Sequence, residues 1–312
     1  MKGKIVALAG GVGAARFLDG MARVVDPKRL FIIGNVGDDA EIHGLHISPD
    51  LDTVLYTLAG LAHPKQGWGI DGDTFRCLKS LERLGGETWF QLGDSDLATH
   101  LYRTDRLRGR AALSSVTAEM ARALGVRAAV VPATDDRLRT IVQTRRGELA
   151  FQTYFVLRRA RDFVIGLKFD GAETARPAPG VREAIRGASA VVVCPSNPFI
   201  SIGPILAVRG VRAALRKTRA PVVAISPIVG GRALKGPAAR MMKSMGLRPS
   251  AAGVAGLYRD FVDVFVLDRL DAREAGSVEA LGMRAVVTNT VMSGMAQKRA
   301  LARTVLRAAG VR

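Results

Sequence analysis

Acidic side chains gather in one short stretch of an otherwise basic chain: Asp38, Asp39, Glu41, Asp50 and Asp52. Proteins bind Mg²⁺ through one or two carboxylates together with substrate phosphates, so this stretch suits that ion. A structural role competes with this chemistry, because Ser48 and Pro49 look like the N-cap and first residue of a helix whose dipole Asp50 and Asp52 would complement. The pattern favours chemistry for Asp50 and leaves Asp52 evenly balanced.

Sites for softer metals and disulfides are not expected. His43 and His46 are three residues apart, but no third nitrogen or sulfur ligand follows them, which disfavours zinc. Cys77 and Cys194 lie far apart in different contexts, and neither has the spacing of a metal ligand. Cys194 ends an apolar run, so we expect it to be a small buried side chain.

A glycine cluster follows the first apolar run. Ile5–Ala9 reads as a strand, Gly10, Gly11 and Gly13 follow it, and Ala14–Val25 reads as a helix. Glycines let a backbone turn sharply and approach a phosphate, while the free N–H groups at a helix start attract anions. The spacing is neither a dinucleotide G-x-G-x-x-G nor a P-loop. A tight turn that needs glycines only for packing is the competing interpretation.

A second polar segment contains aromatic residues. Trp89 and Phe90 could line a pocket for a flat ring, with polar contacts from residues that follow them, namely Gln91, Asp94 and Asp96. Asp94 or Ser95 could instead cap the helix that begins there. His100 lies four residues after Asp96, on the same helical face, and we expect it to form structural hydrogen bonds.

Two later loops also follow apolar runs. One contains Ser196 and Asn197, and the other contains Arg232 and Lys235. Such loops present backbone donors, and their basic side chains can meet a phosphate. The alternative is that both loops are ordinary turns. The position of the loops after predicted strands disfavours that interpretation.

Seven short apolar runs alternate with amphipathic segments and predict a parallel sheet covered on both faces. We therefore expect a Rossmann-like, doubly wound α/β fold, in which ligands bind beyond the carboxyl ends of the strands. The glycine cluster, the acidic stretch and the Ser196 loop all follow such runs. The predicted strands are Ile5–Ala9, Leu30–Ile33, Ala128–Val131, Ala190–Cys194, Val222–Ile225, Val264–Leu267 and Ala285–Thr288.

We predict one Rossmann-like domain over residues 1–312, with an insertion of β or mixed structure at about 134–171. Ile141–Thr144 and Glu148–Val156 alternate around Arg145–Gly147, which indicates a hairpin. This insertion could serve as a lid or as a subunit contact.

The formal net charge of +18 could suggest nucleic-acid binding. Along the sequence, however, the basic residues are spread out, with pairs such as Arg145–Arg146 and Arg158–Arg159 but no longer run, and aromatic residues are only 5%. We expect no nucleic-acid partner, and a basic surface that steers a small polyanionic substrate. Glycines thin the apolar N-terminal run and charged Arg16 and Asp19 follow it, so we expect no secretory leader. No apolar stretch is long enough for a membrane span, and we expect a cytoplasmic protein.

At these residues the sequence resembles the 2-phospho-L-lactate transferase family of coenzyme F420 biosynthesis. The segments that carry the resemblance are Gly10-Gly-Val-Gly, Asn35-Val-Gly-Asp-Asp, Ser48-Pro-Asp-Leu-Asp-Thr-Val-Leu-Tyr, Trp89-Phe-Gln-Leu-Gly-Asp-Ser-Asp-Leu-Ala-Thr-His, Ser196-Asn-Pro-Phe-Ile-Ser-Ile-Gly-Pro-Ile-Leu, Ser226-Pro-Ile-Val-Gly-Gly-Arg-Ala-Leu-Lys-Gly-Pro and Thr288-Asn-Thr-Val-Met. Ala14-Ala15-Arg16 departs from the family, which often has a further glycine and a lysine there.

The resemblance implies a Mg²⁺-dependent, homodimeric transferase. Its donor would be a guanosine diphosphate-linked three-carbon acid, and its acceptor the deazaflavin alcohol Fo, giving F420-0 and GMP. Asp50 would be the catalytic residue, as a metal ligand or as the group that orients the attacking hydroxyl. The expected metal ligands are Asp50 and Asp38. The expected Fo contacts are Asp50, Asp52, Gln91, Asp94 and Asp96. The expected nucleotide or phosphate contacts are Gly10, Gly11, Gly13, Asn35, Asp38, Ser196, Asn197 and Arg232.

Two other functions compete with the transferase. Related nucleotide-sugar-binding regulators share the glycine loop and the fold without transferase activity. A nicotinamide oxidoreductase is weaker still, because no acidic residue follows a proper fingerprint at the required distance. The three-carbon acid is open among phospholactate, phosphoenolpyruvate and a phosphoglycerate. Phospholactate is our default, and the polar residues that could contact the acid are His46, Ser95 and Ser196.

Overall fold

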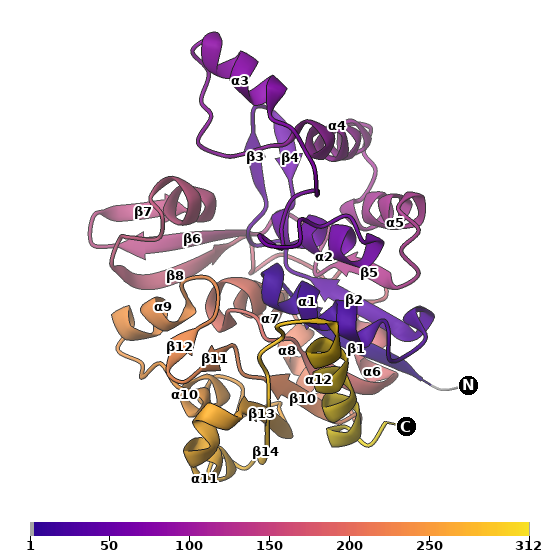
Figure 1. The fold of residues 1–312 in the computed structure, drawn as a ribbon, viewed down its shortest axis with the longest axis vertical. Coiled ribbons are helices and arrows are strands. Elements are labelled where there is room, and N and C mark those ends of the chain that lie inside the picture. The colour runs from indigo at the N-terminus through magenta and orange to yellow at the C-terminus, as the bar shows by residue number, and fades with distance from the viewer. Residues whose placement is uncertain (1–2, 312) are drawn as a thin grey trace.

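The apolar runs form one parallel sheet. Within residues 3–311, which the computed structural model describes, seven strands pair in the order β14-β13-β10-β9-β1-β2-β5 (Figure 1). Every neighbouring pair is parallel. All seven predicted runs are strands of this sheet, which confirms the α/β prediction. Their bounds are β1 (Lys4–Ala9), β2 (Leu30–Gly34), β5 (Ala129–Pro132), β9 (Ala188–Val193), β10 (Val222–Ile225), β13 (Val264–Asp268) and β14 (Arg284–Thr288).

The strand order reverses at β1. Ile5 pairs with Leu30 of β2 on one side and with Ala190 of β9 on the other. Helices flank the sheet, and β1 and β9 are therefore apolar and almost wholly buried instead of alternating. The reversal lies between β1 and β9, so the loops that follow these two strands border a crevice at the carboxyl edge.

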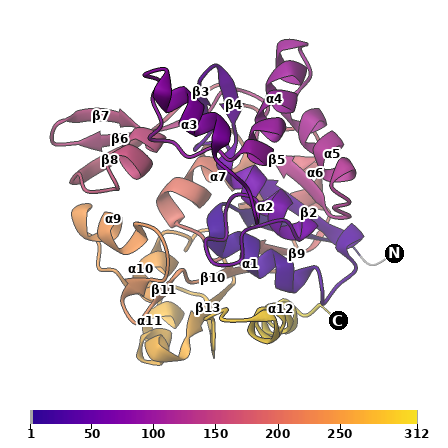
Figure 2. The same ribbon diagram turned by 45° about the horizontal axis from the view of Figure 1, so that its top comes forward.

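Helices pack in two groups around the sheet (Figures 1 and 2). The first comprises α1 (Gly11–Met21), α2 (Pro49–Ala59) and α12 (Met295–Ala308), and the second α6 (Val181–Arg186) and α8 (Val211–Lys217). The remaining helical segments of the core are α5 (Leu113–Ala123), α7 (Gly203–Ala207), α9 (Ala238–Ser244), α10 (Ala251–Gly256), α11 (Ala275–Glu279), η1 (Pro27–Arg29), η3 (Pro198–Ile202) and η4 (Arg269–Glu274).

The first helix differs from the prediction of Ala14–Val25. It begins inside the glycine cluster, at Gly11, and ends at Met21. The chain must turn at Asp26–Pro27 to enter β2, and a residue before proline disfavours helical geometry. The free N–H groups at the start of this helix therefore belong to Gly11, Val12 and Gly13.

A second layer stands above the carboxyl edge (Figures 1 and 2). It comprises the hairpin of β3 (Ala40–Ile42) and β4 (Leu45–Ile47), with α3 (Arg76–Arg83) and α4 (Asp94–Arg108). The helix α3 projects at the top of Figure 1, and none of its residues is buried.

The predicted insertion contains a three-stranded antiparallel sheet of β7 (Gly147–Ala150), β6 (Arg139–Thr144) and β8 (Val164–Asp170). The hairpin of β6 and β7 confirms the expected turn, but the second strand does not extend to Val156. The chain becomes helical after Ala150 and forms η2 (Thr153–Leu157). Phe151 stacks on Phe155 at 5.4 Å, the i, i+4 spacing of a helix.

The insertion has a small core of its own that joins it to the main body. Its buried members include Val142 and Tyr154 from the insertion together with Ile200 and Met241 from η3 and α9. A short hairpin of β11 (Ile228–Val229) and β12 (Arg232–Ala233) lies beyond β10.

Among the described helices, no single one is both long enough and apolar enough to cross a bilayer. A bent pair, Pro198–Ala207 with Val211–Lys217, meets that test by length and composition.

Candidate functional site

Three chain segments converge at the carboxyl edge beside Gly10. A Cβ atom built on Gly10 would lie 2.6 Å from Asp50 Oδ2, 2.7 Å from Ser201 Cβ and 3.1 Å from Asn35 Cβ. Real Cβ atoms do not approach other atoms so closely, so this position requires glycine. The loop after β1, the loop after β2 and the start of α2 thus meet at one point, as the sequence predicts for Gly10, Asn35 and Asp50.

The glycine loop also lies in close contact with the loop after β9. A Cβ atom on Gly13 would overlap the carbonyl oxygen of Pro195, and Gly11 has a φ of +72°, which favours glycine. The two loops on either side of the strand-order reversal are therefore in direct contact. This is the position at which open α/β sheets bind ligands.

Asp50 is the second residue of α2, directly after Pro49. Its Oδ2 accepts a 2.8 Å hydrogen bond from Asn35 Nδ2, which also donates to the carbonyl of Ile200 at 3.0 Å. Asn35 Oδ1 accepts from the Gly37 N–H at 2.9 Å, so the amide of Asn35 links three segments. Burial raises the pKa of Asp50 to about 6, although hydrogen bonds from Asn35 and the Gly11 N–H oppose the shift.

Asp38 is a second buried carboxylate that interacts with Asp50. Burial and the neighbouring charge of Asp50 raise the pKa of Asp38 well above its ordinary value. Within residues 3–311, Asp38 Oδ1 has no hydrogen-bond partner, and neither has Asp39 Oδ1. The other oxygen of Asp39 accepts from Ser48 Oγ and contacts His46 Nε2.

This donor set fits Mg²⁺. Two buried carboxylates that repel each other, one with an unpartnered oxygen, gain from a divalent cation between them and a substrate phosphate. In the part of the chain that the structure describes, no three His, Cys, Asp or Glu side chains are placed to hold a metal by themselves. Water or substrate oxygens would therefore complete the coordination.

Helix capping differs from the sequence predictions. The Ser48 side chain makes no capping bond to α2 and donates to Asp39 instead. Gly93, not Asp94 or Ser95, is the N-cap of α4, and the Asp73 carboxylate accepts from the N–H groups of its first turn at 2.8 and 3.0 Å. Caps supplied from twenty residues away leave no local sequence signal.

Asp52 takes part in a buried ion-pair network. Arg103, only 1% exposed, pairs through both terminal nitrogens with the two oxygens of Asp52. His100 lies between the aspartates, 3.8 Å from Asp52 and 3.3 Å from Asp96, which also accepts from the Tyr56 hydroxyl at 2.6 Å. The Arg103 guanidinium donates a 3.3 Å hydrogen bond to His100 Nδ1, which confirms the structural hydrogen bonding that the sequence predicted for His100.

Arg103 and Tyr56 were not singled out from the sequence. A signal existed for Arg103, because Asp96, His100 and Arg103 share one face of a helix. The oxygens of Asp52 and Asp96 are engaged within the protein. Asp94 likewise accepts from the N–H groups of Arg76 and Cys77 at the start of α3. Substrate contact by these three aspartates, and by the exposed Gln91, stays a prediction.

The remaining phosphate candidates have different surroundings. Ser196 is buried, and its Oγ has no partner within residues 3–311. Asn197 Oδ1 accepts from the Phe199 N–H at 2.9 Å and so caps η3. Arg232 is exposed on β12. His46 is engaged with Asp39.

A further basic pair consists of Arg16, on α1, and Lys235, in the segment after β12. Lys235 Nζ donates to the carbonyls of Lys65 and Gln66 at 3.2 and 2.8 Å. Burial and the charge of Arg16 lower the pKa of Lys235, which places the two cations near each other. Arg16, noted from the sequence only as a departure from the family, is thus a candidate phosphate contact.

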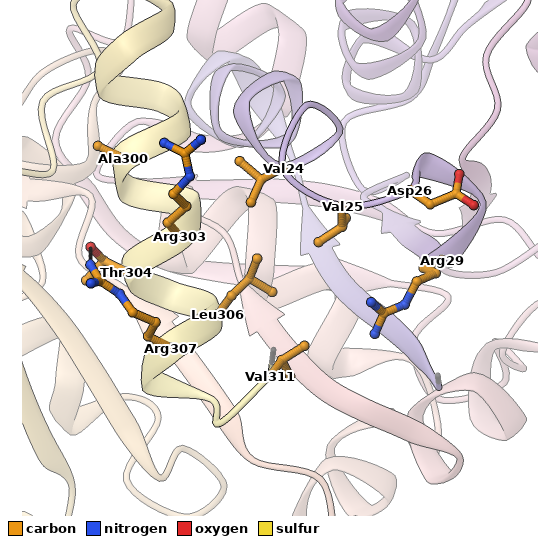
Figure 3. A pocket seen from close by; sticks show the side chains of 10 residues that line it. All are labelled: Val24, Val25, Asp26, Arg29, Ala300, Arg303, Thr304, Leu306, Arg307 and Val311. Carbon is orange, nitrogen blue, oxygen red and sulfur yellow. Dashed lines mark hydrogen bonds between the residues drawn. The ribbon is translucent and has the colours of Figure 1, made fainter. Parts of the chain in front are cut away.

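A cavity of about 790 Å³ lies elsewhere, between the end of α1 and α12 (Figure 3). Val24, Val25 and Arg29 line it from the segment that precedes β2, so it opens at the amino edge of the sheet. The carboxyl edge holds the polar cluster instead.

The chain is similar in sequence to known transferases along nearly its whole length. A family model described as 2-phospho-L-lactate transferase CofD matches residues 5–301. The chain is 37% identical to a 2-phospho-L-lactate transferase of Methanosarcina acetivorans over 97% of this chain and 98% of that protein. It is 40% identical to a phosphoenolpyruvate transferase of Streptomyces avermitilis over 97% of both.

A solved structure shares the fold. The crystal structure of a member of the UPF0052 family from Bacillus halodurans superposes with a TM-score of 0.67 at 17% identity, covering 98% of this chain and 99% of that one. The match of the family model across the sheet and the glycine loop confirms the resemblance drawn from the sequence. The chain belongs to the 2-phospho-L-lactate transferase (CofD) family.

Proposed function

We propose that this transferase moves a phospho three-carbon acid from a guanosine diphosphate-linked donor to the deazaflavin Fo. The ribityl hydroxyl oxygen of Fo attacks the distal phosphorus and forms a new P–O bond. The phosphoanhydride bond breaks as GMP leaves with its electron pair, and the hydroxyl proton is released. The products are F420-0 and GMP.

One observation carries the proposal: the buried pair of Asp50 and Asp38 beside the glycine loop, at the reversal of the strand order. Phosphoryl transfer needs in-line positioning and charge stabilisation more than covalent help. The loop supplies backbone N–H groups for the diphosphate. A carboxylate with a pKa of about 6 is ionised at neutral pH and can accept the hydroxyl proton.

We propose that Asp50 and Asp38 hold Mg²⁺. When bound there, the ion would offset the negative charge of the diphosphate. Asn35 fixes the orientation of Asp50 through its 2.8 Å hydrogen bond, whether Asp50 serves as metal ligand or as base. Arg16 and Lys235 add positive charge near the same loop.

The identity of the acid is the finer part of the proposal. Phospholactate remains our default, and relatives of similar identity are named for phospholactate and for phosphoenolpyruvate. The acids differ by a double bond or a hydroxyl. A pocket that hydrogen-bonds a hydroxyl strongly rejects analogues that lack this group. The unpartnered Ser196 Oγ is a candidate for such a contact.

The test is a direct assay. The protein is incubated with Fo, Mg²⁺ and each of the three guanylylated donors, and the products are identified by mass. A product with the mass of Fo plus the phospho acid, formed together with GMP, supports the proposal, and the preferred donor identifies the acid. Binding of a UDP-sugar without turnover of any donor would contradict it and favour the regulator.

A further inference from the structure

A second cavity, of about 740 Å³, lies at the outer end of the insertion. None of the described residues that line this cavity belongs to the candidate site, and Figures 1 and 2 both show β7 and its turn with β6 extending away from α1 and α2. Five arginines line it from two segments of the chain, namely Arg145, Arg146, Arg158, Arg159 and Arg161.

The charges of these arginines are poorly balanced. Among the described residues that line the cavity, Asp162 is the single acidic side chain, and it lies 3.9 Å from Arg158. The other four guanidinium groups have no carboxylate within 4.0 Å in the described part of the chain. Like charges gathered around one cavity repel each other, and an anionic ligand would relieve that repulsion.

The backbone holds this cluster in place. Arg159 and Ala160 have φ angles of +54° and +50°, which non-glycine residues rarely adopt and which persist only where the surroundings impose them. The Arg240 guanidinium donates to the carbonyl of Ala160 at 2.6 Å and fixes this turn from α9. On the other side, the Arg146 N–H donates to Thr144 Oγ1 at 3.1 Å.

An aromatic ring fixes one of the cations. The Arg145 guanidinium lies 4.3 Å from the ring centroid of Phe163, a cation–π contact that orients it at the cavity wall. Phe163 and Leu157, both lining residues, are 45% and 49% exposed. The rim of the cavity is therefore apolar beside its basic wall.

We propose that this cavity binds a phosphate-bearing anion with several negative charges. Planar guanidinium groups match phosphate oxygens with paired hydrogen bonds, and the volume lies within the range of small-molecule sites. The ligand is either a free oligophosphate or the headgroup of an anionic phospholipid, next to which Phe163 and Leu157 would contact acyl chains. The proposal is independent of the transferase reaction.

The first test measures binding of inorganic tripolyphosphate by calorimetry. The double variant R145S/R158S should lose one binding site or weaken its affinity at least tenfold. The control R303S/R307S removes the same charge from the cavity of Figure 3 and should bind as the wild type does. Equal loss in both variants would show attraction by net charge alone and overturn the proposal, as would unchanged binding in R145S/R158S. Equal melting temperatures of the two variants serve as the folding check.

The second test separates the two sources of phosphate. Flotation with phosphatidylglycerol vesicles, with phosphatidylcholine vesicles as reference, is run on the same proteins. Capture that R145S/R158S loses and R303S/R307S keeps identifies the lipid headgroup, whereas tripolyphosphate binding without capture identifies a free anion. Binding of neither probe overturns the proposal. Tighter binding of a DNA oligonucleotide through the same arginines would also overturn it.

Discussion

At the scale of single residues, burial determines what each carboxylate can do. Asp94 is solvent-accessible, and hydrogen bonds from Thr74 and from two backbone N–H groups lower its pKa. Its carboxylate therefore stays ionised and has a structural role. Asp50 and Asp38 are buried beside each other, and burial raises both of their pKa values. Together with the position of the two carboxylates beside the glycine loop, these raised pKa values favour a chemical role for Asp50 and Asp38.

We expect Asp50→Asn to fold normally and to lose turnover by at least about a hundredfold, the scale of losing a positioned catalytic group. The amide keeps the shape of the side chain and can still accept from Asn35. Initial rates with Fo and a guanylylated donor, together with thermal melting, provide the measurement. Near-normal turnover with unchanged Mg²⁺ dependence would show that Asp50 only complements the dipole of α2.

Stability should depend on pH and Mg²⁺ together. The pKa of Asp50 in the fold, about 6, exceeds its ordinary 3.8, so the folded state binds this proton more tightly than the unfolded chain. The stabilising contribution is complete below pH 3.8 and is lost as pH rises through about 6. A cation on the ionised carboxylates offsets that loss.

Mg²⁺ should therefore raise the melting temperature at pH 8, should do so less at pH 5, and should have no effect on Asp50→Asn. Melting scans with and without the ion at both pH values provide the test. An equal Mg²⁺ effect on the variant would place the ion elsewhere.

At the scale of secondary structure, α2 serves two sites at once. Asp50 and Asp52 are two residues apart, which in a helix turns them about 200° from each other. Asp50 therefore faces the glycine loop, while Asp52 faces α4 and pairs with Arg103. The buried ion pair holds the helix that carries Asp50.

Replacing Arg103 with Met should destabilise the fold by about 3–5 kcal/mol, because Asp52 would be left buried without a partner. The double variant Arg103→Met with Asp52→Leu should recover most of that loss. Urea unfolding of the two variants and the wild type gives both values. A cost below about 1 kcal/mol for the single variant would mean that water or another cation compensates Asp52.

The contact between the two loops can be tested with one methyl group. Gly13→Ala would place a Cβ against the carbonyl of Pro195 and should cost about 1–3 kcal/mol together with most of the turnover. The control Gly256→Ala, in α10 with open space around it, should be neutral or stabilising by up to about 1 kcal/mol. Equal behaviour of the two variants in urea unfolding would show that the loops move apart freely.

At the scale of the whole molecule, the fold gathers basic residues that are dispersed along the sequence. The net charge of +18 is spread along the sequence. The structure nevertheless brings the pairs Arg145–Arg146 and Arg158–Arg159 to one cavity, because the hairpin turn and the segment after η2 lie together. In the sequence, both pairs had been interpreted only as part of a dispersed basic charge.

Even so, we expect no tight binding of arbitrary nucleic acid. Aromatic residues are only 5% of the chain, too few for a stacking surface, and the clustered arginines surround a cavity instead of forming a long stripe. Filter binding of a random DNA duplex at physiological salt should give a dissociation constant no lower than the usual non-specific range of about 10⁻⁴–10⁻⁶ M. A submicromolar constant would make the basic surface a nucleic-acid site.

The strands, the glycine loop and the start of α2 could be predicted from the sequence, because each depends on a local pattern of residues. Buried strands read as continuous apolar runs, and this local pattern located all seven strands of the sheet within a few residues. The glycine cluster and Pro49 likewise act on their own backbone, so the loop and the start of α2 were predictable. Helical periodicity could also have separated Asp50 from Asp52.

The side-chain contacts between distant residues could not be predicted from the sequence, because they depend on how the chain folds in three dimensions. Asp52 pairs with Arg103 across 51 residues, Asp73 caps a helix 22 residues away, and Asn35 reaches the carbonyl of Ile200 across 165. Such contacts form only when long loops close, and no local period in the sequence records which distant side chains then meet. The same is true of the pKa values of Asp50 and Asp38, because burial and a neighbouring charge are properties of the assembled fold.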